Sequence, residues 1–516
     1  MSTTRQKLRT KTGCLNCRNR RKKCDEKSPV CTRCALSGRE CQWPTTADLL
    51  DRRHAAHIEA RHSPTADSSS FLRGEGTAPT SEPLATISFT SDKAARHALS
   101  SHLEDTFSRH FVKDYSSLLL LPNCHPDFYQ GWINELQDLM VQENGLRYSV
   151  LANAASHMHF VEECPKMQQM ALLYYSKSLK GLSDMIVKSS QFESHNGVLM
   201  SVMLLYLHGC IGRGTYNDIP RHLRAATRVL QMRLFSAPQN FSRPFDRLAV
   251  ESVLYHIFLA STGLWSDEYK LDYEFDMPFW IRAEQMLDQD LLFPCQSYSL
   301  NSPILGMPAA LFRIVIELKQ LDSRTPKWKD NLERLRNEIE TWEAFLLSDK
   351  ETDVPAENYY RDASYLYILI ASMLLEQRSS SDIERPGPPN MPPREGWQII
   401  KATQILRKYK DDEGWANCFI GNWPVYSIGY FVSTSEDAGL VASDLQRRWQ
   451  NTKFMQIARY KYDLGNTWSK RGLAALPDEQ NPSSPRYGTL SLLTDDLLEP
   501  SVKAKNHSRC ERILSP

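Results

Sequence analysis

Most of the chain carries apolar residues at the spacing of amphipathic helices. From about residue 92 to residue 476, apolar positions recur three or four residues apart over segments of roughly 12 to 20 residues. Clear examples are Val150, Leu151, Ala154, Ala155 and Met158; Leu172, Tyr175, Leu179 and Leu182; and Leu332, Leu335, Ile339 and Trp342. Alternating β-branched residues, which would indicate strands, are nearly absent. The pattern predicts a mainly α protein with a large all-helical domain of roughly a dozen helices.

Prolines mark where several of these helices should begin, because a first helical turn tolerates proline. Pro220 precedes a predicted helix over 221–233, Pro308 one over 309–322, and Pro326 one over 327–347. A stretch rich in Pro and Ser, 379–393, interrupts the helical pattern, and a second, 477–487, ends it. We therefore expect a helical domain over 92–476 and a tail over 477–516.

Residues 45–91 have a different composition, dominated by Ser, Thr, Pro and Ala. Such a segment buries too little apolar surface to offset its ordering entropy, so we expect a flexible linker. A short helix over 47–61 is conceivable, but its apolar residues do not sustain a heptad. We expect no coiled coil there, and the oligomeric state of the chain stays open.

The charge of the chain is distributed unevenly. The 516 residues carry a net charge of +1, yet the first 44 hold 12 Lys and Arg against three acidic residues. That head therefore carries +9, and the other 472 residues carry −8. A basic head on an acidic body indicates a polyanion bound at one end. No apolar run reaches about 18 residues, so we expect no membrane span.

Six of the 12 cysteines lie in the head, and their spacing repeats. Cys14, Cys17 and Cys24 form C-x2-C-x6-C, and Cys31, Cys34 and Cys41 repeat it without change. Zinc takes four ligands in a tetrahedron, and thiolates suit it. Two zinc ions need eight ligand positions, so two of the six sulfurs must bridge both ions. The equivalent first cysteines, Cys14 and Cys31, are the natural bridging pair.

Two other uses of these cysteines fit less well. A disulfide framework belongs to secreted proteins, and the polar, basic residues after Met1 do not form a secretion signal. Iron–sulfur clusters take four cysteines at other spacings. We expect two structural zinc ions, which would supply the folding free energy that so small a head cannot obtain from an apolar core.

A dense basic run lies between the second and third cysteines. Residues 18–23 carry five cations in six positions: Arg18, Arg20, Arg21, Lys22 and Lys23. Cations packed this densely repel one another unless phosphates neutralise them, and arginine can also hydrogen-bond the edge of guanine. About one and a half turns of helix fit between Cys17 and Cys24. We expect this helix to present the cations to double-stranded DNA.

At these residues the chain closely resembles the fungal binuclear zinc cluster family of transcription factors. The match runs over Gly13-Cys14-x-x-Cys17-Arg18-x-Arg20-Arg21-x-Lys23-Cys24-Asp25-Glu26, Pro29-x-Cys31-x-x-Cys34 and Gly38-x-x-Cys41-x-Trp43. The resemblance implies that Cys14 and Cys31 bridge the zinc ions, Cys17 and Cys24 complete one site, and Cys34 and Cys41 complete the other.

The resemblance also implies how the head binds DNA. Family members place the first short helix in the major groove over CGG triplets. Arg21 stands at the family's base-reading position with Arg20 beside it, and Arg18 and Lys23 suit phosphates, with Lys22 in the same run. The resemblance therefore implies a chain that acts in the nucleus as a sequence-specific regulator of RNA polymerase II genes.

The helical region resembles the fungus-specific regulatory domain that often follows such clusters. The stretches 146–157, 174–179 and 222–226 carry this resemblance, which fades after about residue 267. It implies regulation through the transcription machinery, co-regulators or an effector. In the tail, 490–499 interleaves acidic residues with leucines, which indicates either an activation segment or a terminal helix packed on the domain.

Two other classes of function fit the sequence less well. An enzyme would need a catalytic constellation in the helical region, and we find none, so we expect no catalytic residues. His157 and His159 point about 200° apart on a helix, which disfavours a shared metal. A scaffold that uses the cluster only for protein contacts is disfavoured by the basic run.

Overall fold

The computed structural model describes residues 14–20, 22, 24–27 and 29–43, and then 98–473 apart from 190, 235–240, 242, 267–269, 295, 349–353 and 381–395. The chain divides into two compact units: residues 1–88, which include the 44-residue head, and residues 89–516, from here on called the body. The predicted linker 45–91, the possible helix 47–61 and the tail 477–516 lie outside the described residues.

All regular structure in the described residues is helical, which confirms the predicted fold class. The head contains α1 (Leu15–Asn19) and α2 (Thr32–Leu36). The body contains α5 (Ala98–His110), α6 (Pro126–Gln142), α7 (Asn144–Glu162), α8 (Pro165–Lys188), α9 (Asn196–Ile211), α10 (Ile219–Leu234), α11 (Pro244–Thr262), α12 (Met277–Gln289), α13 (Tyr298–Asn301), α14 (Ala309–Gln320), α15 (Trp328–Ser348), α16 (Pro355–Ser380), α17 (Trp397–Lys408), α18 (Glu413–Asn417), α19 (Asn422–Phe431), α20 (Ser435–Thr452) and α21 (Met455–Arg471).

The predicted helix starts agree with the observed ones. Pro220 lies in the first turn of α10, Pro308 is the N-cap of α14, and α15 begins at Trp328, two residues after Pro326. None of the described helices is long and apolar enough to cross a membrane.

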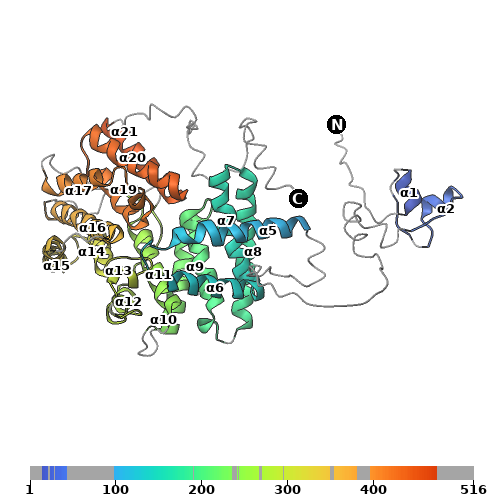
Figure 1. Cartoon of the computed structure of the whole chain (residues 1–516), viewed down its shortest axis with the longest axis horizontal. Coiled ribbons are helices and arrows are strands. Elements are labelled where there is room, and N and C mark those ends of the chain that lie inside the picture. The colour runs from blue at the N-terminus through green and yellow to red at the C-terminus, as the bar shows by residue number, and fades with distance from the viewer. Residues whose placement is uncertain are drawn as a thin grey trace, which may run out of the picture. The chain divides into compact units, whose positions relative to one another are not determined.

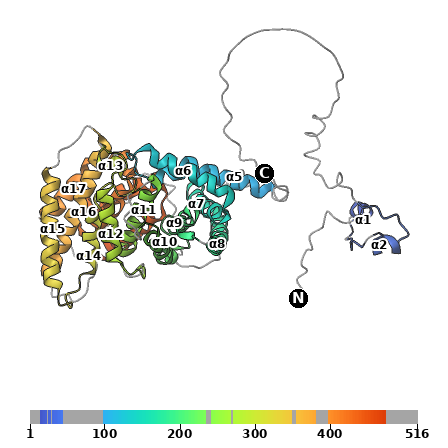
Figure 2. The same ribbon diagram turned by 90° about the horizontal axis from the view of Figure 1, so that it is seen from below.

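Two helices, α9 and α11, form the centre of the body. Every residue of α9 is buried, and so is nearly all of α11. A helix that is apolar all round must be covered on every side. Figure 1 shows α9 between α7 and α11, and Figure 2 shows α15 at the end of the body away from α7 and α8.

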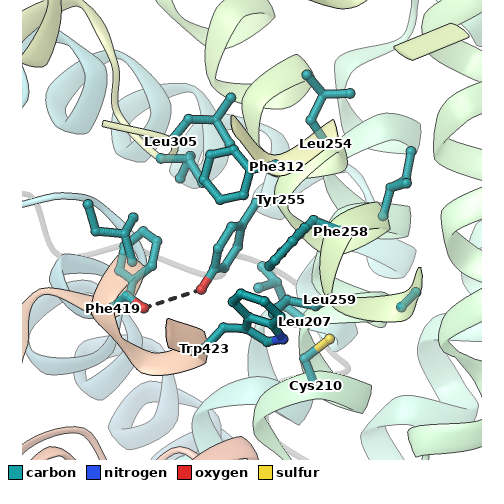
Figure 3. Packing of buried hydrophobic residues seen from close by; sticks show 14 of the residues in the cluster. Leu207, Cys210, Leu254, Tyr255, Phe258, Leu259, Leu305, Phe312, Phe419 and Trp423 are labelled. Atoms are coloured by element: carbon teal, nitrogen blue, oxygen red, sulfur yellow. Dashed lines mark hydrogen bonds between the residues drawn. The ribbon is translucent and has the colours of Figure 1, made fainter. Parts of the chain in front are cut away.

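Aromatic residues join α11 to the C-terminal helices. The Tyr255 hydroxyl donates to the carbonyl oxygen of Phe419 over 3.2 Å, as Figure 3 shows. The ring of Phe258 meets that of Trp423 edge to face, with centroids 4.9 Å apart. Aromatic pairs at this separation add stabilisation beyond the area they bury. These contacts make the body one continuous core.

The last helix also reaches back to α9. The guanidinium of Arg459 in α21 donates to the carbonyl oxygens of Gly209, Cys210 and Gly212, at 3.3, 2.7 and 3.0 Å. These carbonyls lie at the C-terminal end of α9, where a cation also complements the helix dipole.

His157 and His159 of α7 are both hydrogen-bonded to backbone carbonyl oxygens. A ring nitrogen of His157 lies 3.0 Å from the Thr452 carbonyl oxygen, and one of His159 lies 2.9 Å from that of Cys164. His157 is also 2.9 Å from a ring nitrogen of His110 in α5. These contacts occupy both histidines in packing helices together.

Candidate zinc centre and nucleic-acid interface

Each half of the cysteine repeat starts a short helix with its first cysteine. The backbone N–H of Cys17 points at the Cys14 sulfur over 3.5 Å, and the N–H of Cys34 points at the Cys31 sulfur over 3.4 Å. A side-chain acceptor at the N-cap satisfies one of the orphan N–H groups of a helix. The sequence repeat therefore becomes a structural repeat, with α1 after Cys14 and α2 after Cys31.

The six sulfurs form two interlocking groups of four. In one group Cys14, Cys17, Cys24 and Cys31 have sulfurs within 4.8 Å of one another, and in the other Cys14, Cys31, Cys34 and Cys41 do. The two groups share Cys14 and Cys31, the pair that the repeat suggested as bridges.

The sulfur spacing fits zinc. The Cys14–Cys31, Cys14–Cys34 and Cys17–Cys31 sulfurs are each 3.7 Å apart. A tetrahedral zinc ion with bonds of about 2.3 Å sets sulfur–sulfur edges of about 3.8 Å. Cys14 and Cys31 are fully buried, so four sulfurs would surround each ion without an open position for water.

The protein environment affects the thiols unequally. The backbone N–H of Cys34 lowers the pKa of Cys31 to about 6, whereas burial raises the pKa of Cys34 to about 12 and also raises that of Cys14. Zinc binds the thiolate form of cysteine. Because burial disfavours that form at Cys14 and Cys34, the positive charge of the zinc ions must stabilise it there.

Polar contacts hold the loops around the sulfurs. Asp25 accepts a hydrogen bond from the Thr32 backbone N–H at 3.1 Å, and the Thr32 hydroxyl, which also donates to it, lowers the pKa of Asp25. The indole N–H of Trp43 donates to the Pro29 carbonyl oxygen over 2.8 Å. The Asn16 amide donates to the Glu40 carbonyl oxygen over 3.1 Å. Asp25, Pro29 and Trp43 stand in the family motif, but nothing in the sequence singled out Thr32 or Asn16.

The helix before the basic run differs from the prediction. We expected a helix between Cys17 and Cys24, but α1 spans Leu15–Asn19. It starts early because the Cys14 sulfur caps its first turn. Beyond its end, the N–H of Arg20 still donates to Asn16, and that of Lys22 donates to Cys17 over 2.9 Å.

The basic run is described only in part. Arg20 and Lys22 are exposed, and Arg18 lies in α1, where its backbone alone is described. Arg21 and Lys23 lie outside the described residues. The second repeat has Ala35-Leu36-Ser37-Gly38-Arg39-Glu40 in the equivalent place. The two halves thus share a metal-binding pattern but differ in charge, which leaves the first half as the candidate surface for phosphates.

A head with six thiols arranged for two metal ions, followed by a helical body, defines a zinc-cluster protein. A family model for the fungal Zn(2)-Cys(6) binuclear cluster domain matches residues 12–48, and one for the fungal specific transcription factor domain matches residues 106–472. The second match covers more than two thirds of the chain, so the protein belongs to the fungal-specific transcription factor family. Its N-terminal residues carry the Zn(2)-Cys(6) binuclear cluster domain.

Curated relatives are similar over short stretches. Transcription activator AMTR1 of Alternaria alternata is 62% identical over 34 residues, 7% of this chain and 4% of that protein. Transcription factor lfc1 of Flammulina velutipes is 58% identical over 36 residues, 7% and 13% of the two chains. An uncharacterized transcriptional regulatory protein of Schizosaccharomyces pombe is 26% identical over 171 residues, 32% and 27%. The chain thus spans little more than a quarter of these relatives at most. No solved structure matches it.

Proposed function

We propose that the protein regulates RNA polymerase II genes by reading CGG-type sites in the major groove of DNA. The observation that carries the proposal is the pair of sulfur groups that share Cys14, at the start of α1, and Cys31, at the start of α2. Two zinc ions there would make the short α1 and the basic residues after it a rigid unit. A rigid, cationic element of this size suits a DNA groove.

We assign all six cysteines to zinc. Cys14 and Cys31 bridge the ions, Cys17 and Cys24 complete one site, and Cys34 and Cys41 complete the other. The sulfur separations of 3.7 Å support the assignment. The ions are structural, because sulfur fills every ligand position.

Within the basic run we assign different tasks to different cations. Arg21 reads a guanine, with Arg20 beside it, because a guanidinium can bond guanine O6 and N7 together. Arg18, Lys22 and Lys23 bind phosphates, which positions the head without reading sequence. The exposure of Arg20 and Lys22 supports these roles.

The remaining assignments follow from the class of protein. We place the protein in the nucleus, with its DNA-binding domain over 1–44, a linker over 45–91, a regulatory domain over 92–476 and a tail over 477–516. The regulatory domain would contact co-regulators or the transcription machinery. We assign no enzymatic activity.

A binding titration tests the proposal. The full chain, loaded with zinc, is titrated onto a labelled CGG-containing duplex and onto a scrambled duplex of the same composition at two salt concentrations. We expect tighter binding to the CGG duplex, by at least about a hundredfold near physiological salt. Equal affinity for both duplexes would refute sequence reading, and absence of binding to either would favour the scaffold alternative.

A further inference from the structure

Helix α8 carries an apolar stripe on its outer face. Leu172, Leu179 and Ile186 recur every seven residues, with Leu173 and Val187 beside them. Leu179 and Ile186 are each 39% exposed, Leu173 is 53% exposed and Val187 is 83% exposed. The face of α8 that points away from these residues, which includes Tyr174, Ser178 and Met185, is buried in the body. A seven-residue apolar repeat is the pattern that accepts a second helix alongside. These five outer residues are here called the outer stripe.

Lysines flank the outer stripe. Lys177, Lys180 and Lys188 are exposed, and Asp184 is the acidic residue among them. The ammonium of Lys177 lies over the rings of Tyr148 and Tyr174, at 5.2 and 5.3 Å, which holds its charge at the edge of the stripe. Two copies of α8 packed against each other would bring lysines together. The flank therefore favours an acidic occupant over a second copy of the chain.

The tail of this chain contains a segment with the matching pattern. Leu490, Leu493 and Leu497 are spaced three and four residues apart, which places them on one face of a helix. Asp495, Asp496 and Glu499 fall outside that face, and 488–499 contains no basic residue. The segment would offer leucines to the outer stripe and negative charge to its lysines.

The tail is long enough to reach α8. The first turns of α21 lie at the end of α9, where Arg459 binds Cys210, and the loop after α9 meets α8 through the Gln168 amide and the Arg213 carbonyl oxygen, 3.0 Å apart. From Arg459 to the end of α21 is about 18 Å at 1.5 Å per residue. The residues between Leu473 and Leu490 can span up to roughly 55 Å.

We propose that Leu490–Glu499 docks as an amphipathic helix on the outer stripe of α8 in the same chain. Tethering makes the event intramolecular, so even a short segment benefits from a high effective concentration. Docking covers the leucines of the tail, and co-regulators that bind those leucines must then compete with α8. The contact does not depend on which DNA site the head reads.

Photo-crosslinking of the full chain tests the contact. Leu179 is replaced by p-benzoyl-phenylalanine in one sample and Phe345, an exposed apolar residue of α15, in the control. After irradiation, mass spectrometry identifies the crosslinked peptides, with mixed isotope labelling to separate crosslinks within a chain from crosslinks between chains. We expect crosslinks within the chain from position 179 to 490–499, at least fivefold more abundant than from position 345. Equal yields, or crosslinks between chains, would overturn the proposal.

Two sets of variants keep the test independent of folding defects. Leu493→Asp with Leu497→Asp changes only the tail and should reduce the crosslink at least fivefold. Lys180→Glu should weaken it, and adding Asp495→Lys and Asp496→Lys should restore it. A crosslink that withstands the tail variants, or a charge reversal without rescue, would show that the segment does not dock as proposed.

Discussion

Gly145 of α7 and Gly181 of α8 meet backbone to backbone, where a Cβ built on Gly181 would lie 2.6 Å from the Gly145 Cα. The Ser178 hydroxyl donates to the Gly145 carbonyl oxygen over 3.0 Å at the same crossing. Two helices approach this closely only where neither carries a side chain. The crossing therefore fixes how α8 lies on the body.

Gly181→Ala should destabilise the body by about 1–3 kcal/mol, the usual range for overpacking in a core. Gly465→Ala in α21 is the matched control, because a Cβ there meets nothing within 4 Å. That change should be neutral or stabilise by up to about 1 kcal/mol, since alanine favours a helix over glycine. Urea unfolding followed by circular dichroism measures both. Equal effects of the two substitutions would contradict the close crossing.

The sulfur geometry predicts two zinc ions per chain. Cys14→Ala and Cys31→Ala each remove a ligand from both ions and should lose most of the zinc, whereas Cys41→Ala removes a ligand from one and should keep more of it. Elemental mass spectrometry of the full chain and its variants gives the stoichiometry. One zinc per chain, iron in its place, or equal losses from Cys14→Ala and Cys41→Ala would refute the bridged arrangement.

Arg21 and Lys23 should separate base reading from phosphate binding. Arg21→Ala should reduce the binding free energy by roughly 1–3 kcal/mol on a CGG duplex and by much less on a scrambled one. Lys23→Ala should weaken binding to both duplexes equally and should lower the slope of the logarithm of the binding constant against the logarithm of the salt concentration by about one unit. Both substitutions remove one charge, so a difference between them reports contact geometry. Identical losses on both duplexes in a salt titration would argue that Arg21 reads no base.

Buried histidines predict that the body loses stability in mild acid. Burial lowers the pKa of His157, His222 and His256 to about 4, and that of His208 to about 3. Because each folded-state pKa lies below the unfolded value of about 6.5, the stabilisation is complete above that value and is lost as pH falls toward the folded pKa. Lowering the pH from 7 to 5.5 should therefore reduce the free energy of unfolding by about 1 kcal/mol for each of these histidines.

The measurement is urea unfolding at those two pH values. His157→Gln retains an amide N–H for the Thr452 carbonyl oxygen and should remove about 1 kcal/mol of the pH dependence. A variant with the full pH dependence of the parent chain would exclude His157 as a contributor.

The features that the sequence predicted correctly are those that depend on residues close to one another along the chain. Helix starts near Pro220 and Pro308 follow from local backbone preference, and the zinc site follows from a repeat that spans only Cys14 to Cys41. The extent of α1 was predicted wrongly, because its cap is the sulfur of Cys14, a residue considered only as a ligand. The Gly145–Gly181 crossing and the Arg459 contacts could not be predicted, because they join helices whose pairing leaves no local pattern.

The hydrogen bond from Arg459 to Cys210 joins residues 249 positions apart, whereas that from Asn16 to Glu40 in the head spans 24. During synthesis the head can thus acquire its metal and fold once its own residues have left the ribosome. The end of α9 must wait until most of the body has emerged, because its hydrogen-bond donor Arg459 lies in α21, the last of the described helices. A ribosome stalled within the body would therefore present a finished DNA-binding module on an unfinished regulatory one.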